Sequence, residues 1–378
     1  MQCEIKVEHN DVVAAVRGLL RQLLDKGVVD AVFVPLETPD GLVIPALVAD
    51  CAHLETANAF TPLMPINSAR AVSALTGKQT PAPLAALLRP CEIRALVELV
   101  KLKQASLENV ILISLDCLGT CELADYRDLD ENTRTNLLAE LLSAAQTGRE
   151  PAIQPASQRS ACQMCVEPIP ELADITVHLF GCQPSHSLPV TIKDEIATHL
   201  DLSAVAEGAG WSQESASQAA RQWIVGRQKK RAQELESMRR QMQANGGIAS
   251  LFAACVRCHN CMTACPICYC KTCLFKTAPF DHEPAYYLAG ARRKGAQRML
   301  GDTLLFHLTR LNHMSASCVS CGMCTSACPA DIPVGMIFSA VAEQVQATFE
   351  YNPGQSVEEA LPLITFQQDE WTHIGEGA

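Results

Sequence analysis

The sequence has no uninterrupted apolar run long enough to cross a bilayer, although 48% of its 378 residues are hydrophobic. Its first residues, MQCEIKVEHND, carry charges where a signal peptide needs an apolar core. Basic residues are not in excess either: the formal net charge is -11, whereas general nucleic-acid binding depends on Lys and Arg that neutralise phosphates. These absences predict a cytoplasmic protein, without a membrane span, whose partners are proteins or small molecules.

The sequence also lacks the parts of a site for a primary substrate. It contains no molybdopterin-type domain and no convincing nucleophile or acid/base pair. Chemistry on such a substrate is therefore expected on another chain. With 378 residues the chain is expected to form two or three domains, because single hydrophobic cores stop growing near ~250 to 300 residues.

Cysteine is what the sequence has in excess, with 19 residues. In a small secreted chain so many cysteines would predict a disulfide scaffold, but in a long chain without an export signal they indicate metal or redox chemistry. Eleven of them lie between Cys255 and Cys328. The other eight are spread over the first half: Cys3, Cys51, Cys91, Cys117, Cys121, Cys162, Cys165 and Cys182. This uneven distribution predicts two different chemistries along the chain.

The first half alternates between helical and strand patterns. A helix is expected from Val12 to Leu24, capped by Asn10 or Asp11 and ended by Gly27, and Ser68 caps a shorter helix that Gly77 closes. Strands are expected at residues 28–37, 42–49, 83–89, 109–116 and 174–181, with a helix at 92–103. A proline makes the second of these strands an edge or a broken strand. Together they predict an α/β domain over residues 1–190.

Two cysteines of this domain follow predicted parallel strands. Cys91 and Cys117 lie at carboxyl ends of strands, where open α/β sheets bind ligands. The pair CQMC, Cys162 and Cys165, comes later from a loop. Together with Cys91 and Cys117, these cysteines supply four thiolates that could hold a 4Fe-4S cluster. Cys121 competes with Cys117 for the same place. The alternative is that these cysteines are small buried hydrophobic residues, as Cys3, Cys51 and Cys182 are taken to be.

A long helix is expected to link the two halves of the chain. Ser215 and Gln218 have capping-box spacing, and Gly246 and Gly247 stop the helix after about 45 Å, at ~1.5 Å per residue. One face is marked by Ala219, Trp223, Ala232, Leu235, Met238 and Met242. The basic cluster of Arg227, Lys229, Lys230 and Arg231 is expected to be a solvated face, with contact to an acidic cofactor or partner as the alternative.

A proline-terminated cysteine motif occurs twice. Its pattern, C-x2-C-x2-C-x3-C-P, is formed by Cys255, Cys258, Cys261, Cys265 and Pro266, and again by Cys318, Cys321, Cys324, Cys328 and Pro329. In two-cluster ferredoxins three such cysteines wrap one cubane, and the fourth reaches the other cluster. We therefore predict one 4Fe-4S cluster on Cys255, Cys258, Cys261 and Cys328, and its neighbour on Cys318, Cys321, Cys324 and Cys265.

A zinc-stabilised scaffold is the alternative interpretation of these motifs. Structural zinc takes four ligands, usually as two separated C-x2-C pairs, and gains nothing from a third close cysteine or a trailing proline. The spacing therefore favours iron-sulfur clusters.

The segment between the two motifs is mostly helix-forming, so helices are expected to join the cluster loops. His307 and His313 lie in this segment, and packing or partner contact is favoured over a ligand role because eight cysteines are already available. Three extra sulfurs, Cys268, Cys270 and Cys273, exceed the need of two clusters. They could hold another metal or replace one of the assigned ligands.

Five segments together resemble the coenzyme F(420) hydrogenase/dehydrogenase beta-subunit family: VVAAVRGLLRQLLDKGVVDAVFV, LMPINSARAVSALTGK, LLRPCEIRAL, LISLDCLGT and CQMCVEPIPELADITV. The resemblance covers most of residues 10–345 and is greatest to beta subunits of formate dehydrogenases with a C-terminal helical dicluster ferredoxin domain. In that family the α/β module, which corresponds to residues 1–190 here, binds FAD and a 4Fe-4S cluster. It exchanges electrons with a deazaflavin or another two-electron carrier. The family's proline-cysteine, single-cysteine and paired-cysteine motifs match Cys91, Cys117, Cys162 and Cys165.

The resemblance places FAD near Gly77 and Lys78, where the family often has Gly-Ser-Lys-Tyr. Here the sequence is LTGKQT, without the serine and tyrosine. Many relatives also carry the ferredoxin part in front of the flavin-type module or lack it. A flavin-free iron-sulfur wire is therefore the alternative to a flavoprotein.

The resemblance implies an electron-transfer subunit of a cytoplasmic oxidoreductase, a formate dehydrogenase beta subunit, whose catalytic partner is a formate dehydrogenase or hydrogenase subunit. Heterodisulfide-reductase-like subunits are a further expected partner, and the two-electron carrier is left open among deazaflavin, NAD and ferredoxin. The predicted architecture is an α/β flavin-type module at residues 1–190, a helical linker at 191–248, a helical ferredoxin domain at 249–345 and a tail at 346–378. The tail is expected to lie on a partner or on the chain's own domain.

Overall fold

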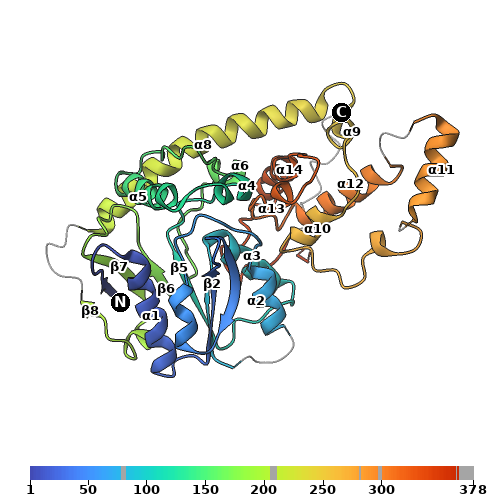
Figure 1. Cartoon of the computed structure of the whole chain (residues 1–378). Helices are drawn as coiled ribbons and strands as arrows, with labels where there is room; N and C mark the ends of the chain where they lie inside the picture. Colours follow the sequence, from blue (N-terminus) through green and yellow to red (C-terminus); the bar gives the residue numbers. More distant parts are fainter. Residues whose placement is uncertain (78–81, 205–210, 281, 297–299, 363, 366–378) are drawn as a thin grey trace.

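The structure, a computed structural model, describes the chain except for residues 78–81, 205–210, 281, 297–299, 363 and 366–378. It has an α/β part built on one sheet and a helical part that follows it, joined along one side by a long helix (Figure 1). In the described residues no helix has the length and apolar character needed to cross a membrane.

One sheet forms the centre of the α/β part. Its strands are β1 (Gln2–Lys6), β2 (Ala31–Glu37), β3 (Val43–Val48), β4 (Leu84–Leu87), β5 (Val110–Leu115), β6 (Ile175–Val177), β7 (Ser187–Ile192) and β8 (Ser203–Ala204), in the order β3-β2-β4-β5-β6-β7-β1-β8. Strands β2, β4, β5 and β6 are parallel, and the other pairings are antiparallel. The parallel core places the carboxyl ends of β4 and β5 side by side.

The strands predicted from the sequence are present, and β3 is the edge strand that its proline predicts. Three strands were missed: β1, β7 and β8. Cys3 and Ile5 of β1 are buried between exposed or half-exposed neighbours. The alternation of buried and exposed residues that marks a strand is therefore present, but it extends over only five residues. Pro189 interrupts the pattern of β7, and β1 pairs with it from the other end of this part of the chain. Such distant antiparallel pairing leaves no local signal.

Helices cover both faces of the sheet. They are α1 (Val12–Asp25), α2 (Ala69–Thr76), α3 (Pro90–Lys101), α4 (Leu123–Arg127), α5 (Glu131–Thr147), α6 (Ser160–Gln163) and α7 (Asp194–Ala197), with a 3-10 turn at Cys51–Thr56. Asp11 caps α1, because its side chain accepts a hydrogen bond from the amide of Ala14 at 2.9 Å. The predicted cap and apolar face of this helix are both present, with Val12, Leu19 and Leu23 buried.

The linking helix α8 (Gln213–Gln243) begins one turn earlier than predicted. Ser212 is the N-cap and Ser215 is the third helical residue, so the expected cap at Ser215 was wrong. The predicted face is buried at Trp223 and Leu235, but Ala232 is exposed. The helix packs on α5 near its start and on α14 farther along, and therefore ties both parts together.

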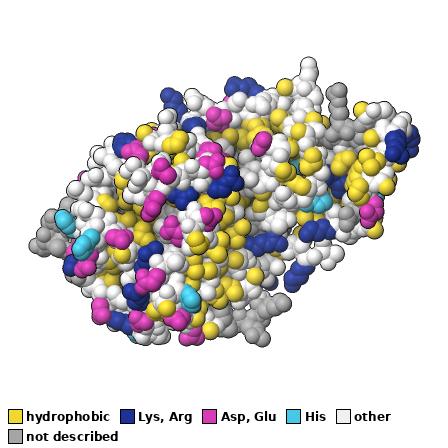
Figure 2. Space-filling model, viewed as in Figure 1, with side chains coloured by type: hydrophobic (Ala, Val, Ile, Leu, Met, Phe, Trp, Pro, Cys, Tyr) yellow, Lys and Arg dark blue, Asp and Glu magenta, His cyan; other side chains and the backbone are white. Residues whose placement is uncertain are grey.

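The helical part consists of α9 (Gly247–Leu251), α10 (Asn260–Ala264), a 3-10 turn at Leu274–Lys276, α11 (Pro284–Lys294), α12 (Thr303–Met314), α13 (Met323–Ser326) and α14 (Val334–Thr348). Helices α11 and α12 join the two cysteine loops, as predicted. Helix α11 projects from the body (Figure 1), and apolar side chains lie on its surface (Figure 2), including Tyr286 and Leu288 at 61% and 59% exposure.

The two parts share a hydrophobic core. One cluster of buried side chains joins Val72 of α2 and Leu96 of α3 to Phe306 of α12 and Ile337 of α14. A second cluster lies on the other face of the sheet, where Trp223 of α8 packs with the residues of α1 and α5. Because one core crosses between the parts, their relative placement is determined by apolar burial and not by a flexible linker.

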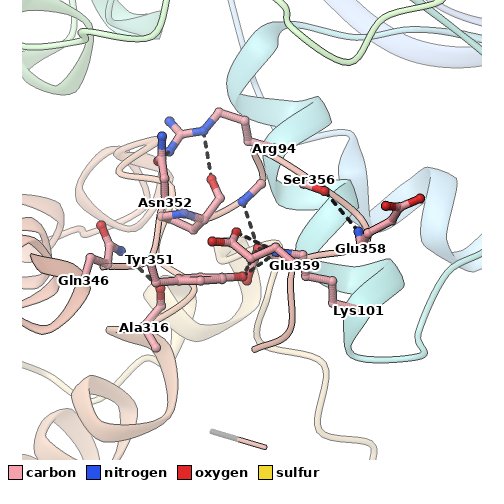
Figure 3. A network of polar contacts seen from close by, with 12 residues as sticks. Arg94, Lys101, Ala316, Gln346, Tyr351, Asn352, Ser356, Glu358 and Glu359 are labelled. Carbon is pink, nitrogen blue, oxygen red and sulfur yellow. Dashed lines mark hydrogen bonds and ion pairs between the residues drawn. The ribbon is translucent and has the colours of Figure 1, made fainter. Parts of the chain in front are cut away.

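The beginning of the C-terminal tail lies on α3 of the α/β part (Figure 3). Tyr351 donates its hydroxyl to Glu98 at 2.5 Å and accepts a hydrogen bond from Lys101 at 2.8 Å. The amide of Gly354 also donates to Glu98, at 2.8 Å, and Arg94 donates to the carbonyl of Pro353 at 3.0 Å. Burial, followed by the hydrogen bond to Glu98, raises the pKa of Tyr351, so the phenol keeps its proton and donates.

Candidate metal centres

Twelve of the cysteines fall into three groups whose thiols lie near enough for their charges to act on one another. The first group is Cys255, Cys258, Cys261 and Cys328; the second group is Cys265, Cys318, Cys321 and Cys324; the third group is Cys91, Cys117, Cys162 and Cys165. The groups correspond to the ligand sets assigned from the sequence, and their binding of clusters stays a prediction.

In the first group, three cysteines come from one loop and the fourth from the other. Burial is the largest cause of the raised pKa of Cys261, and the charge of Arg310 opposes it. The thiolates of Cys255, Cys258 and Cys328 raise the same pKa further. Cys328 follows the second loop, so the chain crosses over between the two motifs at this point.

The second group shows the reciprocal arrangement. The pKa of Cys265 is raised to about 12, chiefly by burial; the charge of Arg310 opposes this rise, and the thiolates of Cys321 and Cys318 contribute to it. Burial also raises the pKa of Cys324 well above its usual value, followed by the charge of Cys265. Cys265 leaves the first loop and therefore lies with the three cysteines of the second.

The two loops share one backbone conformation. Arg257 and His259 of the first loop have φ of 55° and 62°, and Ser320 and Gly322, at the same positions of the second, have 56° and 73°. These left-handed residues turn amides inward: the amide of Arg257 donates to the sulfur of Cys255 at 3.4 Å. The amide of Ser320 makes the corresponding bond in the second loop. Successive inward amides form a concavity that favours anions.

The third group is assembled at the carboxyl ends of neighbouring parallel strands. Cys91 lies in the first turn of α3 after β4, and Cys117 follows β5, as predicted from the sequence. Cys162 lies in the short helix α6, and Cys165 follows the end of this helix. Burial raises the pKa of Cys165 to about 12, and the thiolates of Cys117 and Cys162 add to this.

Cys121 lies beside the third group. It is buried, its amide donates to the carbonyl of Pro62 at 2.7 Å, and it bridges to Gln158. Burial raises its pKa to about 12, and the next largest effect is the charge of Cys162. Its competition with Cys117 for a ligand position stays a prediction.

Buried hydrogen-bond donors surround the thiols. Arg310 is 4% exposed and donates to the sulfur and the carbonyl of Cys261, both at 3.1 Å, while its Nε has no partner among the described residues. The buried side-chain amide of Asn67 lies beside Cys321, and its hydrogen bond lowers the pKa of that thiol against the larger effect of burial. Unpaired buried donors are costly, and the sulfurs of an anionic cluster are acceptors that would satisfy them. The residues present therefore fit 4Fe-4S clusters.

No group of three or more His, Cys, Asp or Glu side chains surrounds a single metal ion in the part of the chain that the structure describes. In a cubane each thiolate binds a different iron, so the four sulfurs are spaced more widely than the ligands of one ion.

His307 packs against the first loop. Its ring stacks on Phe252 with centroids 3.7 Å apart, and its Nε2 lies 3.4 Å from the sulfur of Cys255. Burial lowers its pKa to about 3, so the ring is neutral. This agrees with the favoured packing role, whereas the contact with Cys255 was not foreseen. His313 lies on the exposed side of α12.

The three extra sulfurs form a separate set beside the second group. Burial raises the pKa of Cys268 most, and the charges of Cys270 and Cys273 raise it further. Cys270 is exposed, and the sulfur of Cys273 lies 3.7 Å from that of Met262. Both interpretations of this set, a further metal and the replacement of an assigned ligand, stay predictions.

The residues named for the flavin are only partly described. Lys78 lies outside the described residues. Gly77 ends α2, and a Cβ there would lie 2.7 Å from the carbonyl oxygen of Gln104 and 2.9 Å from that of Ser73. The glycine is therefore required for close packing of the backbone at the end of this helix.

Buried arginines were the main functional residues that the sequence did not reveal. Arg227 was expected on a solvated face but is 2% exposed, so that expectation was wrong. Its guanidinium lies over the ring of Trp223 at 4.0 Å and donates to the carbonyl of Cys162 at 3.1 Å and to Gln158 at 3.2 Å. Arg159 and Arg310 gave no local signal, because their partners are distant in sequence.

Comparison with known proteins extends these observations. Residues 251–332 match the family model of the 4Fe-4S dicluster domain. The chain is 26% identical over 376 residues to the F420-dependent formate dehydrogenase subunit beta of Methanocaldococcus jannaschii, covering 93% of each protein. It is 25% identical over 390 residues to the F420-dependent formate dehydrogenase 1 subunit beta of Methanococcus maripaludis, covering 95% of this chain and 94% of the relative.

A solved structure of the F420-reducing NiFe hydrogenase complex from Methanosarcina barkeri, derivatised with xenon, contains a similar chain with a TM-score of 0.44 and 12% identity. The match covers 62% of this chain and 92% of that one. The two curated relatives are oxidoreductase subunits by name. The resemblance predicted from the sequence is confirmed: over nearly its whole length the chain is similar to beta subunits of F420-dependent formate dehydrogenases, and residues 251–332 match the 4Fe-4S dicluster domain.

Proposed function

We propose that the chain is the iron-sulfur electron-transfer beta subunit of a cytoplasmic formate dehydrogenase complex. Electrons from a catalytic partner subunit, of formate dehydrogenase or hydrogenase type, enter the helical part and leave through the α/β part. The observation that supports this proposal most is that thiols from segments far apart in the sequence lie near enough for their charges to act on one another, as Cys328 does on Cys261 and Cys265 does on Cys324.

Each group is assigned one 4Fe-4S cluster. The first and second groups hold the two clusters of the dicluster domain, and the third group, Cys91, Cys117, Cys162 and Cys165, holds a cluster of the α/β part. Such clusters, when bound, accept and release single electrons at potentials that depend on hydrogen bonds and burial. The chain's own contribution is to hold the sulfurs, exclude water and place donors such as Arg310 and Asn67 beside them.

Binding of iron is coupled to loss of the thiol protons. Burial raises the pKa of most thiols in the three groups, so the metal-free protein keeps them protonated at neutral pH. Metal binding must release these protons, because the thiolate is the ligand. Arg310 opposes the effect of burial on Cys261 and Cys265, which favours their thiolate forms.

We further propose that the α/β part binds a flavin. The related family binds FAD, which would gather two single electrons for a two-electron carrier: deazaflavin, NAD or ferredoxin acting in pairs. The names of the relatives, which include F420 dependence, favour the deazaflavin. Gly77 and Lys78 are the residues proposed to lie at the flavin.

A flavin-free wire remains the second candidate function, because the serine and tyrosine expected before the proline-cysteine motif are absent from LTGKQT. Such a wire would connect the catalytic subunit to heterodisulfide-reductase-like subunits. Anaerobic extraction of flavin from the purified protein separates the two: release of about one FAD per chain supports the flavoprotein, and release of none favours the wire.

The iron-sulfur assignment itself is tested by purification under strictly anaerobic conditions, followed by iron and sulfide analysis. We expect a brown protein with iron and sulfide in equal amounts. A colourless, zinc-loaded protein would support the scaffold alternative and end the electron-transfer proposal.

A further inference from the structure

The cysteine loops of the second and third groups lie in direct contact. A Cβ built on Gly322, the residue after Cys321, would lie 2.4 Å from the Cβ of Ala161, the residue before Cys162. Glycine is thus required at this position for the two loops to approach. The contact lies where the helical part meets the α/β part.

One arginine connects both loops. Arg159 is 3% exposed, and its Nη2 donates to the carbonyl of Cys321 at 3.0 Å while its Nε donates to Ser326 at 3.0 Å. On the other side its Nη1 donates to the hydroxyl of Thr120 at 3.3 Å, and that hydroxyl lies 3.3 Å from the sulfur of Cys162. A single guanidinium therefore holds ligand-bearing segments of two groups, a geometry that its planar fork of donors suits.

The first group lies across a groove from the α/β part. The walls of this groove include Cys328 and Ala264 of the helical part and Cys121, Leu123 and Arg159 of the α/β part. Helix α10, which carries Cys261 of the first group, also contacts the α/β part, because Arg70 of α2 donates to the carbonyl of Thr263 at 2.9 Å.

We infer that Arg159 is the positioning residue of a junction between the second and third centres, which joins the helical part to the α/β part. This inference rests on the proposed function. With clusters bound, a transfer across the junction would oxidise the second centre by one electron and reduce the third by one, without bond changes. The catalytic partner would be the reductant, and the two-electron carrier would accept the electrons.

The junction is tested on the full-length, anaerobically purified protein by electron paramagnetic resonance of the reduced state. Iron and sulfide analysis first establishes how many clusters each variant holds. Removing the first centre with Cys258→Ala should leave the magnetic interaction between the second and third centres unchanged. Removing the second with Cys324→Ala should abolish that interaction. Persistence of the interaction in Cys324→Ala, or its loss in Cys258→Ala, would overturn the junction.

The role of Arg159 is tested with Arg159→Met, using Arg149→Met, an exposed arginine paired with Glu140, as the control. We expect Arg159→Met to retain three clusters but to weaken the interaction across the junction and slow electron equilibration between its two centres. The control should match the parent protein. An unchanged interaction in Arg159→Met would refute the positioning role. If Arg159→Met loses the third cluster, Arg159→Lys, which keeps the charge without the fork, supplies the same comparison.

These results are distinguishable from failure of the proposed function. If the parent protein holds only two clusters, the third centre does not exist and both the wider proposal and the junction are wrong. If the parent holds three clusters and the interaction across the junction does not depend on the second centre, the electron-transfer function stands and only the junction is overturned.

Discussion

The two proline-terminated cysteine loops have the same spacing and the same left-handed backbone positions, but their surroundings differ. Val256, after the first cysteine of one loop, is 61% exposed, whereas Val319, at the same position of the other, is 5% exposed. Cys258 is exposed, while the corresponding Cys321 lies against the α/β part. The same motif thus serves an outward-facing centre and an internal one, and the outward-facing centre suits electron entry from a partner.

Removal of a ligand should give the largest difference between the loops. Cys321→Ala is expected to lose the second cluster and to weaken the interface with the α/β part, because Arg159 binds this loop. Cys258→Ala should lose only the first cluster. The check is the resonance spectrum of the reduced protein together with limited proteolysis. An unchanged spectrum in Cys321→Ala would refute its assignment as a ligand.

Arg310 lies between the loops and should affect both. Its charge acts on Cys261 of the first group and on Cys265 and Cys324 of the second. Arg310→Met removes a buried positive charge that favours the reduced, more negative clusters, so both reduction potentials should fall. Redox titration followed by resonance spectroscopy measures this change. Exposed Arg292→Met is the control, and potentials that stay at the parent values would contradict the account.

Close packing behind the second loop should make it sensitive to one added carbon. A Cβ on Gly335 would lie 2.8 Å from the hydroxyl of Thr325 and 3.5 Å from the sulfur of Cys324. Gly335→Ala should therefore lower the free energy of unfolding by about 1–3 kcal/mol. Gly301→Ala, where a Cβ meets nothing within 4 Å, is the matched control in anaerobic denaturant titrations. Equal midpoints for the two variants would show that the loop adapts without cost.

The smallest expected effect compares the two valines directly. Val319→Ala removes apolar surface from a buried position and should cost about 1–2 kcal/mol of unfolding free energy. Val256→Ala should change it by less than about 0.5 kcal/mol, because this side chain is exposed. Both are measured by denaturant titration of the cluster-loaded protein. A larger loss for Val256→Ala would mean that the first loop is not outward-facing.

Much of the architecture could be predicted because its signals are local. The spacing of Cys255, Cys258 and Cys261 determines a loop, and short apolar runs followed by Cys91 and Cys117 indicate strands that end at one edge of a sheet. The crossover between the motifs also follows from their spacing, because a fourth cysteine placed after the loop points away from the first three.

What could not be predicted depends on contacts between distant segments. Arg159 meets Cys321 across 162 positions, and Arg227 meets Cys162 across 65, so neither appears special in its own sequence neighbourhood. Strand β1 pairs with β7 at the far end of the α/β part for the same reason. The cap of α8 was misplaced because Ser212 and Ser215 are both acceptable caps, and the fold selects the earlier one.

The most direct test of the central claim is quantitative iron and sulfide analysis of the full-length protein, purified without oxygen, combined with spin quantitation after reduction. The account predicts three 4Fe-4S clusters, or about twelve irons and twelve sulfides per chain, and about three unpaired spins. A chain with zinc in place of iron, or with cysteines joined as disulfides under these conditions, would contradict it.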